Sequence, residues 1–106
     1  MKRYFALAAL ASTMIAAPAV ADLDLAKKSG CLACHSIDKK VVGPSWKDIA
    51  AKYAGQDGAK AELVAAIANG SKGKWNSVTG GVPMPPYSPR VADADIETLA
   101  DFILGL

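Results

Sequence analysis

The stretch that decides the fold is Cys31-Leu32-Ala33-Cys34-His35, which contains the only two cysteines and the only histidine of the chain. This C-x-x-C-H spacing is typical of covalent attachment of a c-type haem. The two cysteines lie one helical turn apart, so both sulfurs can reach the vinyl groups on one edge of the porphyrin. The histidine then offers an imidazole nitrogen to the iron. The motif therefore predicts a haem tethered by Cys31 and Cys34 and coordinated by His35.

Other uses of these three side chains fit the sequence less well. A structural zinc site needs four ligands, and His35 is the only histidine. A thioredoxin-like redox pair needs a βαβ context, and the sequence lacks strand-like alternation of useful length. A catalytic cysteine would need a separate histidine base. A plain disulfide between Cys31 and Cys34 stays open for an exported protein.

The N-terminal segment has the pattern of a secretory signal peptide. Lys2 and Arg3 precede an uncharged run rich in alanine and leucine, which ends in Ala19-Val20-Ala21. Small residues at the last and third-last positions are typical of cleavage by signal peptidase. An uncleaved anchor is the alternative, but residues 4–21 are at the short edge for a membrane span. We expect cleavage after residue 21, a periplasmic protein, and a single domain of residues 22–106.

Composition limits what this domain can be. The 106-residue chain is 52% hydrophobic and 21% charged, with a formal net charge of +2. It is too apolar for a disordered chain and lacks the concentrated basic excess of a nucleic-acid binder. So small a domain buries proportionally little surface, so a bulky tethered cofactor would help it to fold. We expect a monomer with no nucleic-acid partner and no stable membrane association.

Apolar periodicity predicts about four short helices. They cover about residues 22–29, the segment from Trp46 to Tyr53 after Pro44, residues 59–69, and a last helix that begins near Asp93. Residues 71–91 are rich in glycine and proline and read as one long loop. Loops of this length in small domains are usually functional or disordered. The aromatic residues and the methionine of this segment favour a binding loop.

Met84 is the candidate for the second axial ligand of the iron. Met1 and Met14 leave with the signal peptide, so Met84 is the methionine that remains, in the run GVPMPP at residues 81–86. The flanking prolines restrict the backbone and present the sulfur with little ordering cost. A thioether raises the reduction potential of a haem. Because His35 and Met84 would fill both axial positions, the site is expected to pass electrons rather than bind substrates.

Three runs of the sequence resemble the small class I bacterial cytochromes c of the c-551/c-552 group. They are CLACHSIDKKVVGPSWKDIAAKYAGQDGA, NGSKGKW and GVPMPP, in the family's order. The resemblance implies an all-α cytochrome c fold, about four short helices around one haem c, with the first and last helices crossing. It also implies that the Pro44 carbonyl accepts the Nδ1–H of His35, that Gly43 allows close approach to the haem, and that the Trp75 indole donates to a propionate. For Pro44 the opening of a helix, and for Trp75 simple core packing, are the alternatives.

The sequence also departs from this family. Ala66 stands where some members carry an arginine near a propionate, so that charge partner is missing. Tyr87 stands where an asparagine often orients the methionine, which leaves the geometry of the sulfur open. The segment from Trp75 to Met84 is longer than usual.

Charge is unevenly distributed along the chain. Lysines flank the haem motif and Trp75: Lys27, Lys28, Lys39, Lys40, Lys72 and Lys74. Acids crowd the last helix: Asp93, Asp95, Glu97 and Asp101. Two solvated faces are the simpler interpretation, but as a set these charges favour a lysine-ringed haem edge that meets acidic partners in brief encounters.

The sequence thus predicts a soluble one-electron carrier rather than an enzyme. Its expected partners are redox proteins: a quinol-oxidising complex or another cytochrome as donor, and a reductase or terminal oxidase as acceptor. The alternative is a haem enzyme or a gas or redox sensor with an open or displaceable sixth coordination position. A subunit of a larger complex is a further possibility.

Overall fold

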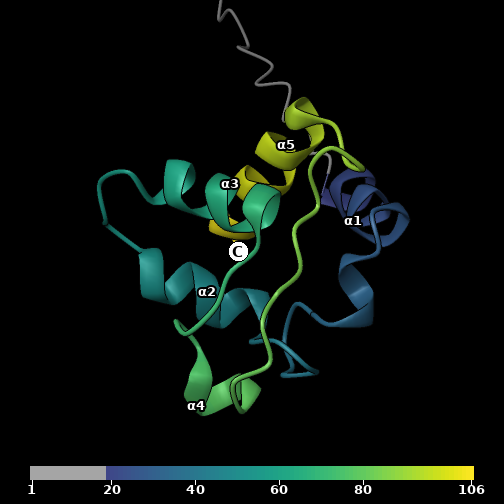
Figure 1. Cartoon of the computed structure of the whole chain (residues 1–106). Coiled ribbons are helices and arrows are strands. Elements are labelled where there is room, and N and C mark those ends of the chain that lie inside the picture. Colours follow the sequence, from purple (N-terminus) through teal and green to yellow (C-terminus); the bar gives the residue numbers. More distant parts are fainter. Residues whose placement is uncertain (1–18) are drawn as a thin grey trace, which may run out of the picture.

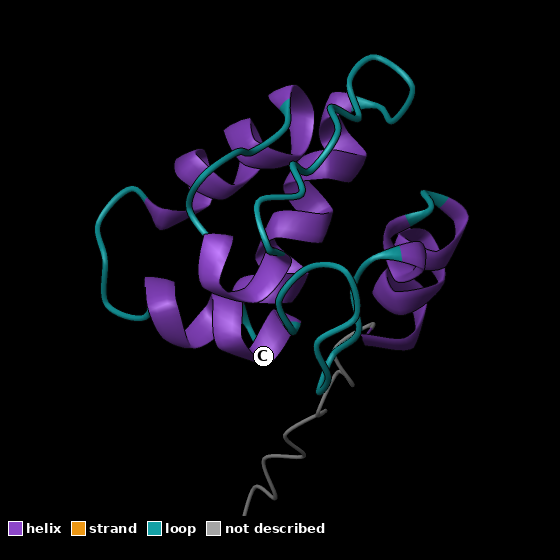
Figure 2. Ribbon diagram, turned by 60° about the horizontal axis from the view of Figure 1, so that its bottom comes forward, coloured by secondary structure: helices purple, strands orange, loops and turns teal. Residues whose placement is uncertain are grey.

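A computed structural model describes residues 19–106 (Figure 1). The described chain forms the helices α1 (Ala19–Lys28), α2 (Trp46–Tyr53), α3 (Ala59–Asn69), α4 (Asn76–Thr79) and α5 (Asp93–Leu104), with a 3₁₀ turn at Cys31–Ala33. Loops connect these helices, and the described part of the chain has no strand (Figure 2). The predicted all-α class is therefore confirmed. The predicted signal peptide lies almost wholly in residues 1–18, outside the described residues.

Local signals set the helix boundaries close to the predicted ones. The Ser45 side chain caps α2 by accepting the backbone N–H of Asp48 at 3.1 Å, as N-cap serines do. At the end of α3, Gly70 adopts a φ of +86°, which glycine tolerates far better than other residues. Helix α5 has Asp93 and Asp95 in its first turn, where carboxylates complement the helix dipole. Helix α1 begins at Ala19, earlier than the predicted start near residue 22.

Helix α5 is the central element of the core. It packs against α1, α2 and α3 (Figure 1). The side chains of Ile96 and Leu99 are almost fully buried there, as is Trp46 at the start of α2. Phe102 meets Trp46 edge to face, with ring centroids 5.9 Å apart. Burial of each large aliphatic side chain contributes about 1.5–3 kcal/mol, so α5 fixes the positions of the helices that surround the site.

The prediction of one uninterrupted loop over residues 71–91 is wrong, because α4 lies within it. The Trp75 carbonyl accepts hydrogen bonds from the N–H groups of Val78 and Thr79, at 2.9 and 2.8 Å. Gly80 then closes the turn with a φ of +64°. A single turn of this kind has no apolar periodicity, so hydrophobic spacing does not reveal it.

Within residues 19–106, we find no helix with the length and apolar character needed to cross a membrane.

Candidate functional site

A cavity of about 300 Å³ opens between α2, α3, α5 and the segment that carries α4. Its lining contains every site residue predicted from the sequence: Cys31, Cys34, His35, Gly43, Pro44, Trp75 and Met84. Aliphatic side chains from three helices form much of its wall: Ile49, Leu63, Ile67, Leu99 and Ile103. A largely apolar cavity with a few convergent polar groups is typical of a cofactor site.

His35 is held at the cavity by its own backbone and by the chain that follows it. Its N–H donates to the Cys31 carbonyl at 3.0 Å, and only 8% of the residue is exposed. Its Nδ1 lies 2.8 Å from the carbonyl oxygen of Pro44. When Nδ1 donates this hydrogen bond, Nε2 keeps its lone pair for a metal. Burial lowers the pKa of His35, while the bond to Pro44 acts in the opposite direction, so the ring favours the neutral form that binds metals.

Gly43 lies against the imidazole because the intervening loop folds back on itself. The N–H of Gly43 donates to the Cys34 carbonyl at 2.8 Å, and His35 and Lys40 form an isolated bridge. A Cβ at position 43 would lie only 2.6 Å from Cε1 of His35. The absence of a side chain at Gly43 is therefore needed for the observed position of the ring.

The two cysteines line the cavity. The N–H of Cys34 donates to the Cys31 carbonyl at 3.2 Å, which closes the 3₁₀ turn. Cys31 is buried, Cys34 is half-buried, and both thiols are free in the described chain. Burial is the main cause that raises the pKa of the Cys31 thiol. Both thiols are thus available to a group inside the cavity.

The backbone of Met84 is fixed by Ser71, a residue that sequence reasoning did not select. The N–H of Met84 donates to the Ser71 carbonyl at 2.8 Å, and the Met84 carbonyl accepts from the N–H of Ser71 at 3.1 Å. Further along, Tyr87 N–H donates to the Ile67 carbonyl at 3.0 Å. A Cβ on Gly70 would lie 2.7 Å from the Met84 carbonyl oxygen. The methionine segment is therefore attached to the end of α3.

Tyr87 is the aromatic residue closest in sequence to this segment. It is buried, lines the cavity, and carries the Arg90 guanidinium 4.8 Å above its ring centroid. Burial raises the pKa of the Tyr87 phenol. Tyr87 thus forms part of the wall on the side of Met84, where the sequence left the geometry of the sulfur open.

At another part of the rim, five side chains join α2, α3 and the chain before α4. The Lys74 ammonium contacts Oε1 of Glu62 at 2.5 Å, and the Tyr53 hydroxyl donates to the same oxygen at 3.3 Å. The Lys52 ammonium lies 4.3 Å from the ring centroid of Trp75 and donates to the Lys74 carbonyl at 3.2 Å. The sequence predicted Trp75 at the site and Lys74 in the lysine ring around it. The other contacts join residues far apart in the chain, and no local pattern signals them.

Comparison with known proteins decides the family. The cytochrome c family model matches residues 24–106. The chain belongs to the cytochrome c family. Among its relatives, cytochrome c-552 of Nitrosomonas europaea is 52% identical over 92% of this chain and 90% of the relative. Cytochrome c-551 of Pseudomonas aeruginosa is 50% identical over 99% of this chain and 98% of the relative.

Solved structures of cytochromes c share the fold. The crystal structure of wild-type Nitrosomonas europaea cytochrome c552 aligns with a TM-score of 0.72 and 54% identity, over 79% of this chain and 98% of that one. The class I cytochrome MtoD of Sideroxydans lithotrophicus aligns with a TM-score of 0.70 and 32% identity, over 85% of this chain and 97% of that one. The predicted cytochrome c fold and the resemblance to the c-551/c-552 group are confirmed.

The cofactor of the family, one covalently attached haem c, suits the cavity of this cytochrome. The walls are apolar, as a porphyrin face requires, and two free thiols stand at the C-x-x-C-H spacing. Gly43 and the Pro44 carbonyl hold one imidazole with its Nε2 free. An imidazole and a thioether are a donor set suited to haem iron.

Proposed function

We propose that this cytochrome is a periplasmic monohaem electron carrier whose iron is ligated by His35 and Met84. Residues 1–21 are the signal peptide that exports it, and residues 22–106 are its single cytochrome c domain. Cys31 and Cys34 tether the haem as thioethers, each formed by addition of a thiol S–H across one vinyl group. The observation that carries the proposal is that both cysteines, the imidazole and the thioether line one apolar cavity.

The residues around His35 and Met84 hold these two side chains in place, so the ligation of the iron would change little during electron transfer. When bound, haem c supplies an iron that cycles between the ferric and ferrous states by gain or loss of one electron. The Pro44 carbonyl holds the imidazole in one orientation and raises its basicity. Both hydrogen bonds to Ser71 and the two flanking prolines hold Met84. Trp75 offers its indole N–H to a propionate, and Gly43 permits close approach.

If His35 and Met84 both bind the iron, the protein would act as a carrier rather than an enzyme. Two protein ligands leave no coordination position for peroxide, oxygen or substrate. The Met84 thioether is a neutral, soft ligand that favours ferrous iron and raises the reduction potential.

The optical spectrum of the purified, exported protein tests the ligation. We expect a c-type haem spectrum that includes, when oxidised, the weak long-wavelength band of sulfur bound to ferric iron. Met84→Ala should remove this band, lower the potential and allow the reduced protein to bind carbon monoxide. If the wild type lacks the band and binds carbon monoxide readily, the alternative of an open or displaceable sixth position replaces the proposal.

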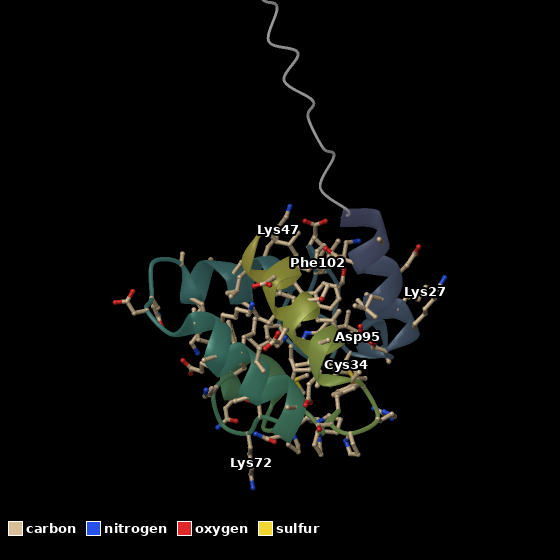
Figure 3. All side chains as sticks on the ribbon, turned by 90° about the horizontal axis from the view of Figure 1, so that it is seen from above. Lys27, Cys34, Lys47, Lys72, Asp95 and Phe102 are labelled. Atoms are coloured by element: carbon tan, nitrogen blue, oxygen red, sulfur yellow. The ribbon has the colours of Figure 1, made fainter. Side chains whose placement is uncertain are left out.

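The surface around the cavity supports brief docking to acidic redox partners. Val42 and Val82 line the cavity and are 42% and 53% exposed, so they form an apolar rim. The lysines of the predicted ring are exposed, and Lys27 and Lys72 extend outward on different sides of the molecule (Figure 3). Charge in such encounters mainly speeds and orients association.

Stopped-flow electron transfer to an acidic partner protein tests the docking surface. The rate should fall as salt rises, and the K39E/K40E double variant should reduce the rate at low salt more than at high salt. If the rate changes neither with salt nor in the double variant, the lysines do not guide docking, and that part of the proposal is wrong. The same assay on K39E alone and on K60E, a lysine of α3 outside the ring, compares equal changes in net charge.

A further inference from the structure

The part of the rim formed by α2, α3 and the chain before α4 carries an unbalanced positive charge. The ammonium groups of Lys52 and Lys74 share one carboxylate, that of Glu62: Lys74 contacts it directly, and Lys52 adds its field. The Tyr53 hydroxyl also donates to that carboxylate. This group of side chains therefore has one cation more than it has anions.

Lys74 is the charged member of this group that lines the cavity. Among the described residues that line the cavity, it is the only lysine, arginine, aspartate or glutamate. Its neighbour Trp75 lines the same wall, and the Lys52 ammonium lies over the indole ring. Ala66, where a charge partner for a propionate was missing from the sequence, lines this cavity too.

Lys74 and the two cysteines line the same cavity from different segments of the chain. A haem has its two vinyl groups on one edge and its two propionates on the opposite edge. The turn Cys31–Ala33 packs beside α1, whereas the chain from α3 to α4 passes α2 on the other side of the molecule (Figure 1). A haem tethered at the cysteines would point its carboxylates toward the rim that holds Lys74.

We propose that Lys74 binds a haem propionate through its ammonium, as the charge partner that Ala66 does not provide. This inference rests on the proposed attachment of the haem at Cys31 and Cys34. Charge-assisted hydrogen bonds between an ammonium and a carboxylate are about twice as strong as neutral ones. The Glu62 carboxylate contacts the same ammonium, and the Tyr53 hydroxyl donates to that carboxylate. Lys74 is thus a positioning residue for the cofactor and a positive charge near the iron.

The effect on the iron has a definite sign. A positive charge near the haem disfavours the ferric state, which carries one more positive charge than the ferrous state. Lys74→Gln should therefore lower the reduction potential, whereas Glu62→Gln, which removes a negative charge and leaves the ammonium in place, should raise it.

The experiment compares holoprotein variants by potentiometry and by resonance Raman spectroscopy of the propionate bending modes, which respond to hydrogen bonds at the carboxylates. Lys74→Gln should shift a propionate mode and lower the reduction potential. Lys74→Arg should keep both the mode and the potential close to the wild-type values. Lys60→Gln is the matched control, because Lys60 is also an exposed lysine paired with a carboxylate, that of Asp101 at 3.1 Å, but does not line the cavity.

The two readouts separate the possible failures. Unchanged propionate modes in Lys74→Gln, or the same shift in Lys60→Gln, overturn the assignment of Lys74. If Glu62→Gln alters the modes as much as Lys74→Gln does, the ion pair between Lys74 and Glu62 acts only by holding the chain before α4 to α3. The inference is then wrong. The oxidised sulfur-to-iron band is recorded for every variant. Its absence from the wild type contradicts the proposed ligation, whereas its presence with unmoved propionate modes contradicts the Lys74 inference alone.

Discussion

Gly43→Ala is the substitution for which the structure gives the sharpest expected cost. The new Cβ would lie 2.6 Å from Cε1 of His35, 3.0 Å from Nδ1 and 3.1 Å from Nε2. To move from 2.6 Å to an ordinary contact of at least 3.4 Å, the imidazole must withdraw by about 0.8 Å. Along the bond, a displacement of that size would lengthen the 2.8 Å hydrogen bond from Nδ1 to the Pro44 carbonyl to about 3.6 Å, beyond the range in which such a bond forms.

The cost of Gly43→Ala follows from these two effects. Overpacking of a filled site costs about 1–3 kcal/mol, and loss of a buried hydrogen bond that leaves its partners unsatisfied costs about 1–3 kcal/mol. The movement of the ring that relieves the overpacking is the same movement that weakens the hydrogen bond, so the two costs do not add in full. We expect Gly43→Ala to lower the free energy of unfolding by about 2–4 kcal/mol. For a domain of this size that corresponds to a fall in Tm of about 10–20 °C. A less basic imidazole should also raise the reduction potential.

Thermal unfolding of the holoprotein, followed by circular dichroism and by the Soret band, measures this loss. Gly105→Ala is the matched control, because a Cβ there meets nothing closer than 3.4 Å and its φ of −83° suits alanine. The control should lie within about 0.5 kcal/mol of the wild type. If Gly43→Ala is as stable as the control and the imidazole N–H keeps its hydrogen-bonded NMR shift, the close packing of Gly43 on His35 does not constrain the site.

Three further predictions concern the elements that support the site. Ser45→Ala should cost about 1 kcal/mol in urea unfolding, because it removes the N-cap of α2; an equal midpoint would contradict the cap. Gly70→Ala should weaken the oxidised sulfur-to-iron band, because a Cβ there lies 2.7 Å from the Met84 carbonyl oxygen; a band of wild-type intensity would refute this. Glu62→Gln should reduce the free energy of unfolding at neutral pH. The hydrogen bond to Lys74 holds the pKa of Glu62 below its usual 4.5, so this stabilisation is present above pH 4.5 and lost as the pH falls through the folded-state pKa. The difference in free energy of unfolding between the wild type and Glu62→Gln, measured by urea titration, should disappear at acidic pH. A difference that stays constant with pH would contradict the prediction.

The chemistry of the site could be predicted from the sequence because it depends on residue types at short, fixed spacings. Two cysteines and a histidine within five positions predict a tethered haem whatever the surrounding structure. The prolines beside Met84 restrict its backbone locally. The same holds for α3, where apolar spacing and Gly70 predict the bounds Ala59–Asn69 that the structure has. The family resemblance added the roles of Gly43 and Pro44, which no local pattern distinguishes from an ordinary helix start.

The remaining features depend on contacts that only the folded chain creates. A carbonyl has no sequence signature of its own. The pairing of Ser71 with Met84 and the two hydrogen bonds to the Trp75 carbonyl at the start of α4 are therefore properties of tertiary and turn geometry. The contact between Lys74 and Glu62 joins two exposed side chains from α3 and the loop after it, and composition gives no reason to pair them. The sequence by itself determined which groups this cytochrome has for holding a haem. The tertiary structure decided which backbone and charged groups surround them, because that arrangement depends on how α5 brings distant segments together.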